Sequence, residues 1–185
     1  MTSRVLKPSD YRVMPWANGQ GSTTEILRHD DAEGRMLWRL SMAVVAVDGA
    51  FSMFDGIERV LTVIEGPGFD LAGAGVHLRA DPLEPVAFAG DIAIAAQNVT
   101  APLVDFNVMV ARRLGAFDVR VLQPGLRVHA AGGPCAVFAL EAGTVSVDAT
   151  DIALARHGLW LGDSAEFVEN SGGVAQIFVQ FPVAV

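Results

Sequence analysis

The chain lacks the features that mark secreted and membrane proteins. Its single cysteine, Cys135, excludes an internal disulfide and is typical of a reducing compartment. No apolar run approaches the ~18–20 residues that a membrane helix needs. Residues 1–10 contain no apolar segment of the kind that a secretory signal requires. We therefore expect a cytoplasmic protein with no membrane partner.

Basic residues are also scarce. The chain has 13 Lys and Arg against 21 Asp and Glu, which gives a formal net charge of −8 and a pI near 4.8. Without a basic cluster, nucleic acid is not expected as a partner. An acidic protein can still bind an anion, but only where a local cation overcomes the overall field. Individual arginines therefore matter more here than the net charge.

Short apolar segments separated by Gly and Pro turns make up most of the chain. Of its 185 residues, 51% are hydrophobic, which is ample for a core. Residues 22–28 alternate in polarity, and residues 36–47 and 59–64 are rich in β-branched side chains, as expected of strands. Few windows show a helical period. Strands at such close spacing predict an all-β barrel or sandwich.

A weak internal repeat indicates two copies of one barrel. Residues 61–66 resemble residues 137–143, because each is a hydrophobic strand that ends in Glu and glycine. Residues 87–91 match residues 159–163 in the same way, each closing on a Gly-Asp pair. Such turns and paired strands look like the cupin jelly roll. We predict a bicupin, with two stacked jelly-roll-like β-barrels in one chain.

The two predicted barrels differ in the polarity of their interiors. Asp105, Asn107 and Met109 share one strand face, whereas the matching face of the second copy is apolar: Ile177, Val179 and Phe181. Buried polar groups cost a few kcal/mol each unless they are satisfied. Their presence therefore indicates a ligand cavity in the first barrel, residues 1–112. The second barrel, residues 113–185, is expected to be structural.

One cation stands at the mouth of an apolar strand within residues 48–66. Phe51 and Phe54 come first, a turn follows, and Arg59 then begins the β-branched strand. This arrangement fits an anion-recognition site in a concave pocket, and it also fits a surface salt bridge.

Four sequence blocks carry a family resemblance. They are Trp16-x-Asn18-x-x-Gly21-x-Thr23-x-Glu25-Ile26, Trp38-Arg39-x-Ser41-x-Ala43, Gly49-x-Phe51-Ser52-x-Phe54-x-Gly56-x-x-Arg59-x-x-Thr62-x-x-Glu65-Gly66 and Asp105-Phe106-Asn107-x-Met109. In order and spacing these blocks resemble the HutD/Ves family, bicupin proteins linked to histidine utilisation in bacteria. The second half of the chain is similar mainly in architecture.

The resemblance implies a regulator-like protein that binds N-formylglutamate, an intermediate of histidine breakdown, and so limits induction of the pathway. No settled enzymatic activity comes with it. The position of Arg59 matches the pocket arginine of the family, and a guanidinium offers the donor fork that suits a carboxylate. The candidate ligand-binding residues are Arg59, Asn18, Thr23, Glu25, Arg39, Phe51, Phe54, Asp105 and Asn107.

Metal binding has little support in the sequence. The four histidines, His29, His77, His129 and His157, are isolated, and the chain has no His-x-His pair. Convergence of His29 and His77 with Glu25 in space is the open alternative. We expect no metal and no other cofactor.

Catalysis has weaker candidates than binding. Cys135 is expected to be a small core residue, and the serines lack a nucleophile motif. Glu25 or Asp105 could act as a general base in an isomerase or amide hydrolase on the same ligand. Alternatively, both carboxylates could form ion pairs with Arg39 or Arg59 and hold the cavity in shape. The expected partner is a small anionic metabolite, and a homodimer is left open.

Overall fold

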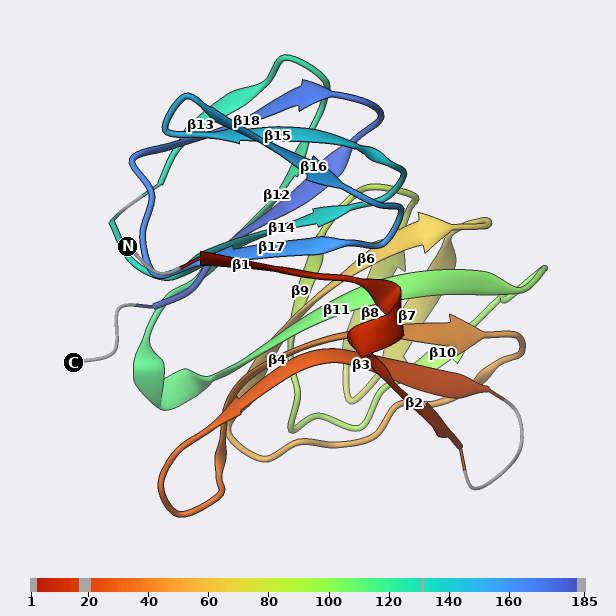
Figure 1. Cartoon of the computed structure of the whole chain (residues 1–185). Helices are drawn as coiled ribbons and strands as arrows, with labels where there is room; N and C mark the ends of the chain where they lie inside the picture. Colours follow the sequence, from red (N-terminus) through yellow and green to blue (C-terminus); the bar gives the residue numbers. More distant parts are fainter. Residues whose placement is uncertain (1–2, 17–20, 131, 183–185) are drawn as a thin grey trace. The chain divides into compact units, whose positions relative to one another are not determined.

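The computed structural model describes residues 3–16, 21–130 and 132–182, and their regular secondary structure is almost entirely β-strand (Figure 1). The chain divides into two compact units. The first unit is Tyr11–Arg113, and the second unit is Leu114–Val185 with Met1–Asp10. The predicted all-β fold of the cupin class is confirmed.

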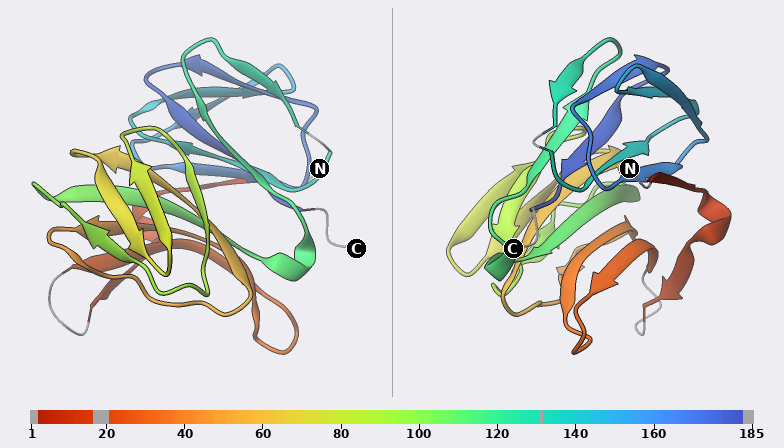
Figure 2. Two further views of the ribbon diagram at one scale, coloured as in Figure 1. Left: turned by 180° about the vertical axis from the view of Figure 1, so that it is seen from behind. Right: turned by 60° about the vertical axis from the view of Figure 1, so that its left-hand side comes forward.

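The first unit contains a six-stranded and a four-stranded antiparallel sheet. The larger sheet has the order β2 (Arg12–Pro15), β3 (Ser22–Asp30), β4 (Met36–Val45), β11 (Leu103–Ala111), β6 (Ile57–Glu65) and β9 (Val86–Ala89). The smaller sheet has the order β5 (Gly49–Ala50), β10 (Ala95–Gln97), β7 (Phe69–Gly73) and β8 (Val76–Ala80). Figure 2 shows the orange β4 beside the green β11 from two further sides.

The second unit also contains two antiparallel sheets. One has the order β12 (Asp118–Leu122), β19 (Gln176–Gln180), β14 (Cys135–Ala139), β17 (Leu159–Gly162) and β1 (Ser3–Leu6). The other has the order β13 (Arg127–His129), β18 (Phe167–Gly172), β15 (Gly143–Val147) and β16 (Thr150–Leu154). The described helices are single 3-10 turns, η1 (Pro8–Asp10) and η2 (Arg112–Leu114), and neither is long enough to cross a membrane.

The internal repeat reappears in the strand order. The run β4-β11-β6-β9 in the first unit corresponds to β12-β19-β14-β17 in the second. Phe106 of β11 and Phe178 of β19, which follow the two Gly-Asp pairs at equal spacing, are both buried. Strands that the sequence shows as similar therefore take equivalent places in the two units.

The first ten residues differ from the expected division at residue 112. The predicted boundary assigns them to the first barrel, but β1 pairs antiparallel with β17, with Ser3 opposite Gly162 and Leu6 opposite Leu159. The N-terminal strand therefore completes a sheet of the second unit. Strand pairing depends on which edge is available, and local sequence does not reveal it.

The core of the first unit also explains how an arginine reaches its interior. Leu61 and Val63 of β6 pack with Phe69 and Leu71 of β7, and all four are fully buried. Burial of one such side chain contributes roughly 1.5–3 kcal/mol. Side chains alternate across a strand, so Arg59 shares the inward face of β6 with Leu61 and Val63.

Candidate functional site

The strand register of the larger sheet brings the polar side chains of the first unit together. On the central strand β11, Asn107 lies opposite Ser41 of β4. Two residues further on, Met109 lies between Arg39 of β4 and Arg59 of β6. These side chains belong to one face of the sheet, because neighbouring residues on paired strands point the same way. A polar patch thus interrupts an otherwise apolar face.

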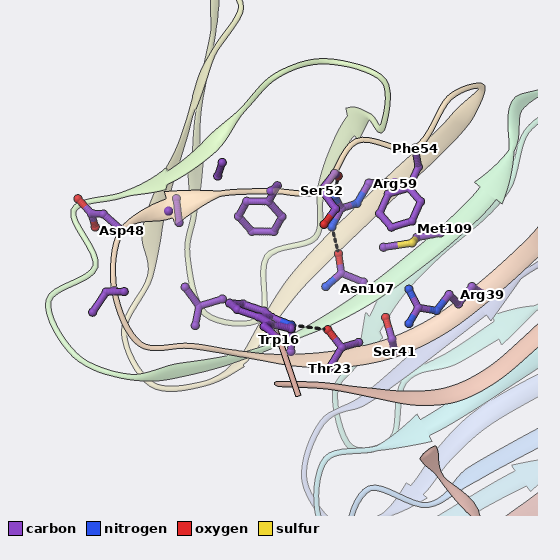
Figure 3. Close-up of a pocket in the computed structure, with 17 residues that line it drawn as sticks. Trp16, Thr23, Arg39, Ser41, Asp48, Ser52, Phe54, Arg59, Asn107 and Met109 are labelled. Carbon is purple, nitrogen blue, oxygen red and sulfur yellow. Dashed lines mark hydrogen bonds between the residues drawn. The ribbon is translucent and has the colours of Figure 1, made fainter. Parts of the chain in front are cut away.

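This patch forms one end of a cavity of about 510 Å³ (Figure 3). The polar side chains that line the cavity are Thr23, Arg39, Ser41, Asp48, Ser52, Arg59 and Asn107. The larger apolar side chains are Trp16, Val45, Val47, Phe51, Phe54 and Met109. The cavity therefore combines a donor-rich end with apolar and aromatic walls.

Arg59 is only 4% exposed and is held by neutral acceptors. One terminal nitrogen donates to Oδ1 of Asn107 at 2.7 Å, and the other donates to the carbonyl oxygen of Ser52 at 3.4 Å. Its Nε has no partner among the described residues. Burial lowers the pKa of Arg59 to about 10; the charge of Asp105 opposes this shift and that of Arg39 adds to it. Arg59 remains a cation at neutral pH and has a donor to spare.

Three phenylalanines surround the Arg59 guanidinium. Its central carbon lies 5.1 Å from the ring centre of Phe51, 5.7 Å from that of Phe54 and 4.8 Å from that of Phe88. Cation–π contacts of this kind contribute roughly 0.5–2 kcal/mol each. The rings also exclude water, which strengthens any ionic contact that Arg59 makes.

Asp105 reaches Arg59 through Asn107. The Asn107 amide donates to Oδ1 of Asp105, while its own oxygen accepts from Arg59. Asp105 is fully buried, and its Oδ2 has no described partner. Burial raises the pKa of Asp105 to about 7, against the opposing effects of the Arg59 charge, the Ala43 backbone N–H and the Asn107 amide. Asn107 therefore connects a buried carboxyl to a buried guanidinium.

Arg39 forms a direct ion pair with Glu25. Its Nε donates to Oε2 of Glu25 at 2.7 Å, and both side chains are largely buried. Of the two, only Arg39 lines the cavity. Asp105 does not line it either. Glu25 and Asp105 therefore lie outside the cavity lining, and the charged groups exposed at this end of the cavity are the two guanidinium groups.

The structure divides the predicted site residues into three groups. Those that line the cavity are Thr23, Arg39, Phe51, Phe54, Arg59 and Asn107. Glu25 and Asp105 support two of these from behind. Asn18 lies outside the described residues. Of the two ion pairs considered from the sequence, Glu25–Arg39 is present, whereas Asp105 contacts Arg59 only through Asn107.

Several lining residues were missing from the predicted set. Ser41 and Met109 follow the same alternation as Arg39 and Asn107, so strand periodicity could have included them. Ser52 contributes a backbone carbonyl, which side-chain patterns do not reveal. Trp16 donates from Nε1 to Oγ1 of Thr23 at 2.9 Å and closes one wall.

The described residues contain no cluster of three or more His, Cys, Asp or Glu side chains suited to a metal ion. His29 and His77 are exposed, on β3 and β8. Cys135 is buried on β14, and burial raises the pKa of its thiol to about 12, with a smaller effect from Asp148. A thiol of this kind is a poor nucleophile at neutral pH.

Fold and cavity together define an all-β protein of the cupin class with a cationic internal pocket. Residues 8–177 match the HutD family model, so the chain belongs to the HutD family, which is linked to histidine utilisation. The resemblance seen in the four sequence blocks is thereby confirmed.

Known relatives agree with this assignment. An uncharacterised 21.2 kDa protein in the hutC 3' region of Pseudomonas putida is 38% identical over 111 residues, and the chain spans 58% of that relative's length. The crystal structure of a conserved protein of unknown function from Pseudomonas aeruginosa PAO1 superposes with a TM-score of 0.85 at 28% identity, covering 97% of this chain and 98% of the other. HutD from Pseudomonas fluorescens SBW25 gives a TM-score of 0.80 at 29% identity, with 97% and 99% covered.

Proposed function

We propose that the chain is a cytoplasmic metabolite-binding protein of histidine utilisation, whose cavity takes N-formylglutamate or a similar small acidic amino-acid derivative. One observation carries the proposal. Arg59 is buried at the cavity wall, uses neutral acceptors, and retains an unpartnered Nε. A buried charge is costly unless it is paired. A ligand carboxylate would supply the partner that Arg59 lacks.

The surroundings of Arg59 suit a carboxylate in particular. A guanidinium donates through a planar fork that matches the two oxygens of a carboxylate. The aromatic rings around Arg59 keep the site dry, so the contact would gain strength. The cavity volume of about 510 Å³ falls within the range of about 300–1,000 Å³ typical of small-molecule sites.

Binding is better supported than catalysis by a carboxylate base. A general base must come within roughly 2.6–3.2 Å of the proton that it removes. Neither Glu25 nor Asp105 lines the cavity. Glu25 is occupied by Arg39, and Asp105 is separated from Arg59 by Asn107. We therefore favour a binding protein over a metal-independent isomerase or amide hydrolase.

A calorimetric titration with N-formylglutamate, followed by NMR of the same mixture, tests this proposal. We expect saturable binding, no new ligand signals over hours, and an affinity that a chelator does not change. Product signals that grow with protein concentration would instead identify an enzyme. Absence of binding at millimolar ligand would exclude this ligand class.

Gly90 supplies a more local test of the pocket. A Cβ added there would lie 2.9 Å from the carbonyl oxygen of Ile57, 3.2 Å from that of Phe54 and 3.3 Å from Cδ of Arg59. Gly90→Ala should therefore displace the Arg59 stem and weaken N-formylglutamate binding several-fold, with a modest loss of thermal stability. The matched control is Gly172→Ala in the second unit, where the added Cβ would meet only Thr144, at 3.9 Å. Equal affinity in both variants would show that Arg59 tolerates the shift.

A further inference from the structure

The cavity contains a second guanidinium whose hydrogen-bonding capacity is mostly unused. Arg39 is 8% exposed and lines the cavity. Its one hydrogen bond within the described residues runs from Nε to Glu25, behind the cavity wall. A guanidinium has five N–H donors in a planar fork. The terminal nitrogens of Arg39 are therefore available on the cavity side.

The two arginines approach the cavity from neighbouring strands. Both pair with Met109 in the register, Arg39 from β4 and Arg59 from β6. Their backbones are thus two strand spacings apart, about 9.5 Å. Figure 3 shows both arginines at the end of the cavity where Asn107 lies. Because both arginines line one cavity, a short ligand with an anionic group at each end can contact both of them.

Of the acidic residues that the structure describes, only Asp48 lines the cavity, and Figure 3 shows it at the end away from the arginines. Glu25 and Asp105 balance the charges of the arginines from behind and do not line the cavity. The charge of Arg39 also contributes to lowering the pKa of Arg59, so the two cations influence each other. A ligand with one carboxylate would pair with one guanidinium and displace water from the other. A ligand with two carboxylates would pair with both guanidinium groups.

We propose that the cavity is a dianion site, in which Arg39 holds a second carboxylate of the ligand whose first carboxylate lies on Arg59. This inference rests on the proposed function and narrows its ligand class to dicarboxylates of about the length of glutarate. Arg39 is then a specificity-determining residue that distinguishes a dicarboxylate from its half-amide. If the Arg39–Glu25 pair only stabilised the cavity wall, the charge of the second ligand group would not affect the affinity.

Matched ligand pairs separate the two cases. Glutarate and glutaramate have the same shape and differ by one charge, as do N-formylglutamate and N-formylglutamine. Loss of a dry charged contact costs roughly 2–5 kcal/mol, so wild type should prefer each dicarboxylate by about thirty-fold or more. Arg39→Gln should weaken dicarboxylate binding much more than half-amide binding and so remove this preference, and Arg39→Lys should keep part of it.

The control is Arg79→Gln, which removes an exposed arginine of the same unit that pairs with Asp70 and Asp81. It should leave both affinities as in wild type. Equal wild-type affinity for the two members of a pair would overturn the dianion site, and so would an Arg39→Gln variant that weakens both equally. The preference ratio in wild type needs no variant, so a poorly folding Arg39→Gln does not prevent the test. The proposed function fails separately, if neither member of either pair binds.

Discussion

Arg59→Ala is expected to weaken N-formylglutamate binding by about thirty-fold or more. The substitution removes the donor fork from a nearly buried position surrounded by the rings of Phe51, Phe54 and Phe88. Loss of one member of a buried charge pair costs roughly 2–5 kcal/mol. Arg59→Lys should recover only part of the affinity, since an ammonium keeps the charge without the planar fork. Calorimetric titration of the three proteins measures both effects.

Thermal melts decide whether Arg59→Ala loses affinity because a ligand contact is gone or because the fold is destabilised. The matched control is Arg120→Ala, because Arg120 is an exposed arginine of the second unit that pairs with Asp118. We expect Arg59→Ala to remain folded, since Asp105 can take up a proton once the nearby cation is gone. An Arg59→Ala protein that melts like wild type and binds as tightly would remove Arg59 from the site.

The second large effect is a pH dependence of the folding stability, which originates at the Asp105 carboxyl. Burial raises the pKa of this carboxyl from 3.8 to about 7 in the folded protein. The folded state therefore holds the proton more tightly than the unfolded chain. The stability that this gives is complete below about 3.8 and is lost as the pH rises through about 7. The free energy of unfolding should fall across this window, and denaturant titrations at a series of pH values measure it.

Ligand affinity should change around the folded-state pKa of Asp105, which is about 7. Below about 7 the Asp105 carboxyl is neutral, so less negative charge opposes an anion at Arg59. The ligand carboxylates stay ionised down to about pH 5. N-formylglutamate should therefore bind several-fold more tightly at about pH 6 than at about pH 8.

Asp105→Asn tests both pH effects, because asparagine keeps an oxygen that can accept from the Asn107 amide. The variant should bind with an affinity that is nearly constant over this window and close to the low-pH value of wild type. Asp118→Asn, an exposed carboxylate change in the second unit, is the control and should follow wild type. A wild-type affinity that does not change between about pH 6 and 8 would show that Asp105 does not titrate there.

Strand periodicity by itself determined a good part of this protein. The close spacing of β-branched segments predicted the all-β fold, and the Gly-Asp pairs predicted the repeat seen in the strand order of the two units. Alternation placed Asp105, Asn107 and Met109 on one face of a strand. The sequence also placed Arg59 at the mouth of an apolar strand, but it left open a pocket and a surface salt bridge. These features depend on nearest neighbours along the chain, which the sequence records directly.

Tertiary structure alone decided how these side chains are connected. Only the pairing of β4, β11 and β6 puts Met109 between Arg39 and Arg59. Only the packed site shows Asn107 as the link between Asp105 and Arg59, and Glu25 as a partner of Arg39 outside the cavity. The pairing of β1 with β17 is likewise decided only by the tertiary structure. Register and long-range pairing arise from the joint packing of distant segments, and no local periodicity of one strand contains them.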